Sequence, residues 1–230
     1  LYTPNGKLHR KLTQLAFLNL LHPFQPFIVG QKIIGPNIAA KFDVPLIFYG
    51  ENQAEYGNPV EQNKTPNMDK SFFSSSEIDI EEMSLGGVKI KNILKNEKFK
   101  INDFTPYIPV SEKIIREKKI EIQYLGYYIN WDQQECYYYA AENTGFKPND
   151  ERNAGTYSKY CSFDDKVDDF HWFTTFIKFG IARATWDACQ EIRTNKITRK
   201  EGVSLVKKYD GEFPKKYFKD FLDYIDIDEK

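Results

Sequence analysis

Polar side chains suited to chemistry gather in the run Gly50-Glu51-Asn52-Gln53-Ala54-Glu55-Tyr56-Gly57. Glu51 and Glu55 are four residues apart, so a helical turn would bring both carboxylates to one side. Together with the amide of Asn52 they form a suitable shell for Mg²⁺, which prefers hard oxygen ligands and is often shared with substrate phosphates. The alternative is that these acidic side chains only stabilise the start of a helix through its dipole.

A second group of candidate residues lies in the later part of the chain. Tyr157, Lys159 and Tyr160 occur together in a predicted loop, where aromatic rings and a cation could bind a ligand through stacking and carboxylate pairing. Lys178 and Arg183 interrupt a largely apolar segment and could bind phosphate or carboxylate. The alternatives are a structural turn for the loop and a solvated helix face for the two cations.

The elements that would position the first group precede it in the chain. Leucines at helical spacing predict an amphipathic helix from Lys7 to Leu21, which the prolines of the following His22–Pro26 segment end. A second helix is expected from Phe27 to Phe42, with Pro36 restarting it. The apolar run Val44 to Tyr49 then predicts a parallel strand covered on both faces, and ligands bind at the carboxyl ends of such strands.

The middle of the chain predicts an insertion followed by a strand and a helix. Residues 58–110 mix short apolar stretches with Asn, Ser and Gly, which indicates irregular and short helical pieces forming either a lid or a mobile surface loop. Ile120 to Ile129 is rich in β-branched and aromatic residues and predicts a strand. Asp132 and Glu135 have capping-box spacing, so a helix is expected from Gln133 to Glu142.

The second group of candidates would lie beside a helical C-terminal region. From Asp164 an apolar stripe at intervals of three or four residues predicts one long helix that carries Lys178 and Arg183. These two cations would project about 140° apart on such a helix, so at most one of them would face a ligand. A capping box at Thr198 and a proline at Pro214 predict two further helices.

Composition narrows the class of protein. Hydrophobic residues make up 41% of the chain, enough for a core, and the net charge of −1 gives no indication of nucleic acid or an anionic membrane as a partner. The chain shows no signal peptide and no apolar run of transmembrane length. Cys136, Cys161 and Cys189 form no CxxC pair, which favours reduced thiols in a cytoplasmic protein. The chain begins at Leu1 without Met, and we expect it to be a portion of a longer polypeptide.

Several motifs, taken in order, resemble the N-acetyl sugar amidotransferases of the PP-loop ATP-pyrophosphatase superfamily. The likeness is closest to the enzymes that form the acetamidino group of pseudaminic acid, and it covers nearly the whole chain outside residues 58–110. The motifs are His22-Pro23-Phe24-Gln25-Pro26-Phe27, Gly30-Gln31-Lys32, Pro45-Leu46-Ile47, the Gly50–Gly57 run, Tyr124-Leu125-Gly126-Tyr127-Tyr128, Trp131-Asp132, Asn143-Thr144-Gly145-Phe146, Gly155-Thr156-Tyr157-Ser158-Lys159-Tyr160, Phe176-Ile177-Lys178-Phe179-Gly180, Arg183-Ala184-Thr185 and Ile197-Thr198-Arg199-Lys200-Glu201-Gly202.

This resemblance implies an ATP-dependent reaction in which AMP is transferred to the oxygen of a sugar N-acetyl carbonyl. Ammonia, from glutamine or a glutaminase partner, then displaces AMP and leaves an acetamidino group. Glu51, Asn52 and Glu55 would be catalytic, with Glu51 and Glu55 as Mg²⁺ ligands and Gly50 beside Glu51 at the ATP site. Tyr157, Lys159, Tyr160, Lys178 and Arg183 would bind a nonulosonic or N-acetyl sugar, in pseudaminic acid biosynthesis for surface glycans or flagellin glycosylation.

The implied fold is α/β, part of a HUP-like (adenine nucleotide alpha hydrolase-like) parallel-sheet domain with a helical C-terminal region. Residues 1–57 would be the later part of the α/β domain, 58–110 the insertion, 111–163 the last strand and substrate loop, and 164–230 the helical region. The family's Ser-Gly-Gly-x-Asp-Ser phosphate loop and its zinc-binding cysteine cluster do not occur in this sequence, so we expect the chain to be inactive alone.

Other functions fit the same residues. One is an amidotransferase for N-acetylated lipopolysaccharide sugars, and another is a non-catalytic carbohydrate-binding or assembly module. We expect a cytoplasmic protein with no nucleic-acid or membrane partner. A homo-oligomer is compatible with these expectations.

Overall fold

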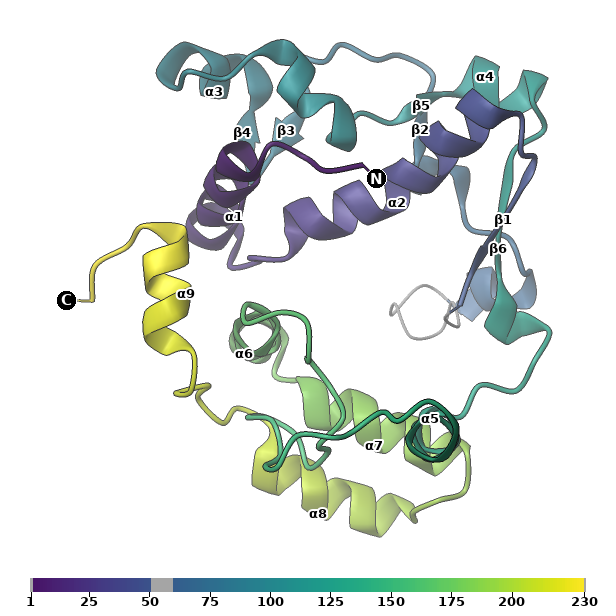
Figure 1. Ribbon diagram of the computed structural model, residues 1–230, viewed down its shortest axis with the longest axis vertical. Coiled ribbons are helices and arrows are strands. Elements are labelled where there is room, and N and C mark those ends of the chain that lie inside the picture. Colours follow the sequence, from purple (N-terminus) through teal and green to yellow (C-terminus); the bar gives the residue numbers. More distant parts are fainter. Residues whose placement is uncertain (1, 51–59, 230) are drawn as a thin grey trace. The chain divides into compact units, whose positions relative to one another are not determined.

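The computed structural model describes residues 2–50 and 60–229, and the chain divides into two compact units. Unit 1 comprises Leu1–Leu20 and Gln25–Trp131, and unit 2 comprises Leu21–Phe24 and Asp132–Lys230. Figure 1 shows both units, with unit 1 carrying every strand of the described residues and unit 2 only helices and loops.

Unit 1 begins with two helices and continues through short elements. Its helices are α1 (Gly6–Leu20), α2 (Gln25–Phe42), α3 (Ile90–Asn96) and α4 (Glu112–Glu117), and its 3₁₀ helices are η2 (Val60–Lys64), η3 (Lys70–Phe72), η4 (Ile101–Tyr107) and η5 (Leu125–Tyr127). Its strands are β1 (Leu46–Tyr49), β2 (Ser74–Ser75), β3 (Ser84–Leu85), β4 (Val88–Lys89), β5 (Val110–Ser111) and β6 (Glu121–Tyr124). The expected restart at Pro36 is wrong, because α2 runs through this proline without a break.

The parallel pair of β1 and β6 confirms a parallel strand before Gly50. The two strands lie side by side in Figure 1, and in their register Leu46 lies opposite Glu121 and Tyr49 opposite Tyr124. The expectation of a strand covered on both faces is wrong, because the side chains of Leu46 and Phe48 remain 43% and 50% exposed. Exposed and partly buried residues alternate along β1. The sequence does not show this alternation, because the exposed residues are apolar as well.

The second strand is shorter than its sequence predicts. It ends at Tyr124, and Leu125–Tyr127 forms a 3₁₀ turn in place of a continued strand. β-Propensity alone does not locate a strand end, since it reflects packing more than backbone preference.

Residues 60–110 form irregular and short helical pieces, as predicted, but they are part of the packing of unit 1. One core contains Met68, Phe73 and Val110 beside residues of α2, α4 and β6. A second core joins α1 to this segment, and its members are Leu8, Leu12, Leu85, Ile90, Ile93, Phe104 and Tyr107. A segment that fills two cores is not a mobile surface loop.

Gly86 shows why this segment requires a glycine where β3 turns into β4. Its φ is +59°, a left-handed value, and a Cβ atom there would lie 2.8 Å from Leu15 Cβ and 2.9 Å from the backbone nitrogen of Ala16. Asn19 donates a hydrogen bond to the Gly86 carbonyl at 2.9 Å, which fastens the turn to α1. The pair Gly86-Gly87 is therefore a structural hairpin turn.

Unit 2 is helical, as the sequence predicts for its C-terminal region. Its helices are α5 (Gln133–Asn143), α6 (Asp168–Phe179), α7 (Arg183–Arg193), α8 (Arg199–Tyr209) and α9 (Phe218–Ile225). Asp132 caps α5 by accepting from the Glu135 amide, and Thr198 and Glu201 form the predicted capping box of α8. The last helix begins at Phe218, later than Pro214 suggests.

The single long helix expected from Asp164 is wrong, because α6 and α7 are separate. Gly180 ends α6 with a φ of +72°, and its amide donates to the Phe176 carbonyl. The apolar stripe continues on both sides of this stop, so periodicity alone hides it. Lys178 and Arg183 therefore lie on different helices, and the angle of about 140° expected between them does not apply.

The fold class is thus confirmed as mixed α/β with small parallel sheets and a helical C-terminal region.

Within unit 2, Phe170 of α6 stacks on Phe221 of α9 with ring centroids 4.2 Å apart. A membrane-spanning helix is not found, since none among the described residues combines the length and apolar character that spanning requires.

Candidate functional site

The first group of candidate residues falls largely outside the described part of the chain. Gly50 follows β1 directly, whereas Glu51, Asn52 and Glu55 lie outside the described residues. Within residues 2–50 and 60–229, no group of three or more His, Cys, Asp or Glu side chains could hold a metal ion. The Mg²⁺ site therefore stays a prediction that rests on Glu51 and Glu55.

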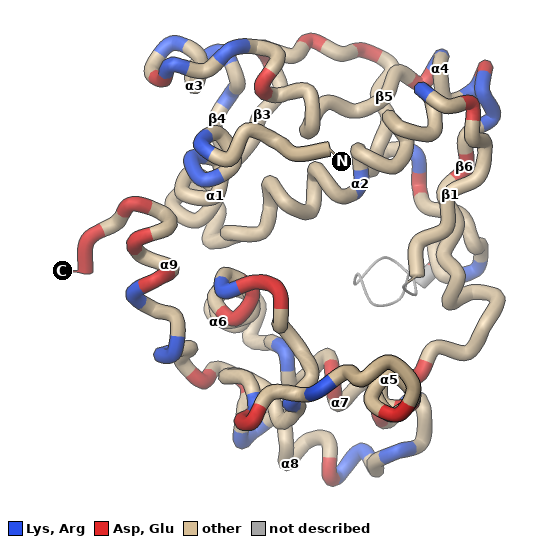
Figure 2. Tube along the Cα trace, viewed as in Figure 1, with Lys and Arg blue, Asp and Glu red and all other residues tan. Residues whose placement is uncertain are grey.

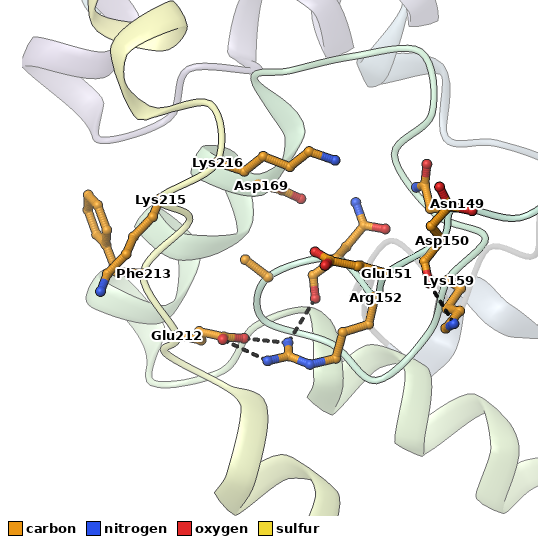
Figure 3. Close-up of a pocket in the computed structure, with 12 residues that line it drawn as sticks. Asn149, Asp150, Glu151, Arg152, Lys159, Asp169, Glu212, Phe213, Lys215 and Lys216 are labelled. Atoms are coloured by element: carbon orange, nitrogen blue, oxygen red, sulfur yellow. Dashed lines mark hydrogen bonds and ion pairs between the residues drawn. The ribbon is translucent and has the colours of Figure 1, made fainter.

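Unit 2 contains an open cavity of about 800 Å³, and most of the residues that line it are charged or polar. Three parts of unit 2 form it: the loop 149–154 with Lys159, the first turn of α6 at Asp169, and the segment from Glu212 to Lys216 that follows α8. Figure 3 shows these side chains arranged around a common space. The volume lies in the range of small-molecule sites, and the charged and polar side chains offer hydrogen-bonding groups to a polar ligand such as a sugar.

An ion pair fixes one end of this cavity. Arg152 donates two hydrogen bonds to the carboxylate of Glu212, at 2.6 and 2.8 Å, as the dashed lines in Figure 3 show. Glu212 also accepts from the Gly155 amide at 3.0 Å, and the Arg152 guanidinium lies 4.7 Å from the ring centre of Tyr209. The hydrogen bond from Arg152 is the main reason that the pKa of Glu212 is lowered. This bidentate pair joins the loop to the segment after α8.

Asp169 is the cavity residue with the most perturbed acidity. It lies beside Asp168 in the first turn of α6, where Figure 2 shows acidic residues clustered. Burial and then repulsion from Asp168 raise the pKa of Asp169 to about 6, against weaker opposing effects of Asn153, Arg183 and Lys216. A carboxyl group of this pKa changes charge near neutrality, as groups in binding and catalytic sites often do.

Three lysines line the cavity, and they differ in where they point. In Figure 3, Lys216 extends toward the space beside Asp169, whereas Lys215 runs toward Phe213. Lys159 donates to the backbone carbonyl of Asp150 at 2.7 Å. Lys159 was expected from the sequence to bind substrate, and it does line the cavity; its role there stays a prediction.

A buried polar network lies next to Asp169, one of the cavity residues. Arg183, at the start of α7, bonds Asp187 at 3.1 Å and lies 3.8 Å from Asp168. Asp187 accepts from the hydroxyl of Thr156, and Asp168 accepts from Ser162. Burial tends to lower the pKa of Arg183, but the attraction of Asp187 and Asp168 outweighs it and raises that pKa. Burial also raises the pKa of Asp168.

This geometry gives Arg183 an internal role. Its charge is already paired with two carboxylates, and its side chain is only 19% exposed. It does not line the cavity, and neither does Lys178, which is exposed in the last turn of α6. The structure therefore does not bring these two cations to the same space as Lys159.

The two tyrosines of the predicted substrate loop pack inside unit 2. Tyr160 stacks on Tyr137 with ring centroids 4.5 Å apart and donates to Gln134 at 3.3 Å. Tyr157 lies 6.2 Å from Tyr209 between ring centres. Burial raises the pKa of both hydroxyls, so both are neutral at physiological pH. Neither ring lines the cavity, and their predicted contact with substrate stays a prediction.

Four residues of the cavity are not predicted from the sequence, namely Arg152, Asp169, Glu212 and Lys216. They are distant in sequence, and no spacing links them. The only local signal was a run of acidic residues at Asp164, Asp165, Asp168 and Asp169, which the helix start explains equally well.

Residues 154–230 match the family model described as LPS biosynthesis protein WbpG-like, C-terminal domain. The matched stretch includes Lys159, Asp169 and the segment Glu212–Lys216, and thus most of the cavity wall. The match fits a sugar-modifying family, in agreement with the coarser form of the sequence expectation. No curated protein compared with the chain matches it.

Proposed function

We propose that this chain is the sugar-binding part of an ATP-dependent amidotransferase that modifies an N-acetylated sugar in lipopolysaccharide biosynthesis. The reaction would convert an acetamido group to an acetamidino group, with ammonia supplied by glutamine or a glutaminase partner. The ordered motifs that resemble sugar amidotransferases support the chemistry. The match of residues 154–230 to a lipopolysaccharide-biosynthesis family supports the substrate class.

The observation that carries this proposal is the cavity of unit 2. Its side chains offer a cation at Lys216 for a carboxylate or phosphate, and Asp169 and Asn153 for sugar hydroxyls. An acidic sugar would use both kinds of contact.

The family description favours a lipopolysaccharide sugar, and the motif resemblance keeps pseudaminic acid as the second candidate substrate. ATP and Mg²⁺ remain part of the proposal through Gly50, Glu51, Asn52 and Glu55. The described residues supply no metal-binding group of their own. We therefore derive no catalytic step through the metal or the nucleotide.

Sugar binding tests the proposal on the chain itself. Calorimetric titration with a nucleotide-linked N-acetyl aminouronic acid should show saturable binding, and the matched N-acetyl sugar without a carboxylate should bind more weakly. Lys216→Gln should weaken the carboxylated ligand about tenfold, as loss of one charge-assisted contact would. Lys178→Gln is the control, since this lysine lies outside the cavity.

Turnover of the complete amidotransferase proposed above tests the chemistry. With ATP, Mg²⁺, glutamine and the sugar, mass spectrometry should show the acetyl oxygen replaced by NH, together with release of pyrophosphate. Tight sugar binding without this product would indicate that the protein is a non-catalytic carbohydrate-binding module. Failure to bind any N-acetylated sugar would refute the proposed function.

A further inference from the structure

Asp169 and Lys216 line the same cavity with opposite charges and remain without an ion pair among the described residues. Lys216 lies 5.0 Å from the ring centre of Tyr217, which attracts a cation but does not neutralise it. Asp169 lies in a partly buried position that penalises its ionised form. Two opposite charges that share one cavity without an ion-pair partner suit a ligand that carries both charges itself.

The groups that face Asp169 show that its carboxylate is available. Asp168 on the same helix repels it, and Asn153 from the loop donates one hydrogen bond. Arg183 on α7 is near enough to lower the pKa of Asp169, but its guanidinium is bound to Asp187 and Asp168. Lys216 acts on it from the segment after α8. None of these groups fills the bidentate acceptor positions of the carboxylate.

We infer that the cavity binds a zwitterionic ligand, with Asp169 pairing an amidinium group and Lys216 a carboxylate. This inference rests on the proposed function, because forming an acetamidino group on an acidic sugar creates such a zwitterion. A protonated amidine is planar and presents two parallel N–H donors, which match a carboxylate as a guanidinium does. Asp169 is then the residue that distinguishes the acetamidino product from the acetamido substrate.

The substrate amide lacks this match. It offers one N–H donor, and its carbonyl oxygen is repelled by an ionised carboxylate. At lower pH the protonated Asp169 can donate to that carbonyl, so the preference should shrink as the carboxyl becomes neutral. The cavity should therefore bind the cationic acetamidino group most tightly when Asp169 is ionised.

Two small probes test this on the complete chain by calorimetry or NMR titration. Para-amidinobenzoate and para-carbamoylbenzoate have the same shape and carboxylate and differ only in NH₂⁺ against O. We expect the amidino probe to bind at least about tenfold more tightly at pH 7, the scale of one charge-assisted bidentate pair, and the ratio to fall toward pH 5.

Three variants separate the contacts. Asp169→Asn should bring the two probes to equal affinity. Lys216→Gln should weaken both probes by the same factor and keep their ratio. Lys207→Gln should leave both affinities unchanged, because this lysine of α8 does not line the cavity.

The wild-type chain alone can refute the inference. Equal affinity for the two probes, or no binding of either, would show that the cavity is not built for a zwitterion. A preference that survives Asp169→Asn would refute the assignment to this residue. If no N-acetylated sugar binds but the amidino probe is preferred, the proposed function is refuted and the zwitterion site is supported. If the sugar binds but the amidino probe is not preferred, the proposed function is supported and product recognition by Asp169 is refuted.

Discussion

Replacing Arg183 with Met should destabilise unit 2 strongly. Arg183 is 19% exposed and holds Asp187, which is 8% exposed, at 3.1 Å. Its contact with Asp168 is longer, at 3.8 Å. Met keeps much of the side-chain volume but removes the charge, so Asp187 would remain buried with only Thr156 as a donor among the contacts described. Removing one partner of a buried pair costs about 3–5 kcal/mol, and we expect about 3 kcal/mol because Arg183 retains some exposure.

Urea unfolding followed by tryptophan fluorescence would measure this loss. Trp172 reports on the site directly, since its ring centre lies 5.2 Å from the Arg183 guanidinium, and it contacts Trp186 at 5.3 Å. Lys166→Met is the matched control, because it removes an exposed pair with Asp220 whose side chains are 60% and 51% exposed. Exposed pairs contribute about 0–1 kcal/mol, so this control should change little.

The pH dependence gives a second check. Burial raises the pKa of Asp168 and Arg183 lowers it, so loss of Arg183 should raise that pKa further. The destabilisation should therefore shrink as the pH falls from about 7 to about 5, where Asp168 takes up a proton more readily. Adding Asp168→Asn should recover part of the loss at neutral pH. A loss below about 1 kcal/mol at pH 7 would refute the view that this cluster holds unit 2 together.

Three further predictions concern stability and the cavity. Gly86→Ala should cost about 2–4 kcal/mol in thermal unfolding, from its left-handed φ and from contacts at 2.8 and 2.9 Å, whereas Gly145→Ala, with a similar φ of +72° and open space, should cost about 1 kcal/mol. Glu212→Gln should loosen the loop at Arg152, seen as faster amide exchange at Gly155, and an unchanged rate would contradict the clamp. Burial raises the pKa of the Asp169 carboxyl from its reference value of 3.8 to about 6 in the folded chain. Ionisation of this group should therefore lower the free energy of unfolding by about 2 kcal/mol as the pH rises from about 4 to 6. Asp169→Asn should remove this decrease, as measured by thermal unfolding across the same pH range.

Capping residues in the sequence predicted the starts of two helices. Asp132 and Thr198 were identified because a capping side chain acts on amides two or three residues away, and the structure shows both bonds. The stop at Gly180 was missed because the apolar stripe has the same period on both sides of it. A strand end such as that after Tyr124 depends on which neighbour is paired, and this is not encoded locally.

The cavity was harder to foresee than the helices for the same reason. Lys159 was identified from its neighbours in the loop, but Asp169 and Lys216 acquire their environment only when α6 and the segment after α8 come together. Tyr157 and Tyr160 are stacking residues, which are used both in protein cores and in sugar sites. The sequence alone does not separate these two uses, because burial is a property of the folded chain. Their contact with substrate stays a prediction.

The charged residues of unit 2 fall into two kinds, and their contrast indicates where a ligand would bind. Arg183 and Arg152 are each matched by carboxylates at hydrogen-bond distance, so their charges are accounted for by the fold. Asp169 and Lys216 share a cavity without such partners, although burial already penalises the ionised form of Asp169. Replacing Asp169 with Asn should therefore make the free chain more stable while removing its preference for a cationic ligand group, the opposing effects expected of a residue kept for binding rather than for folding.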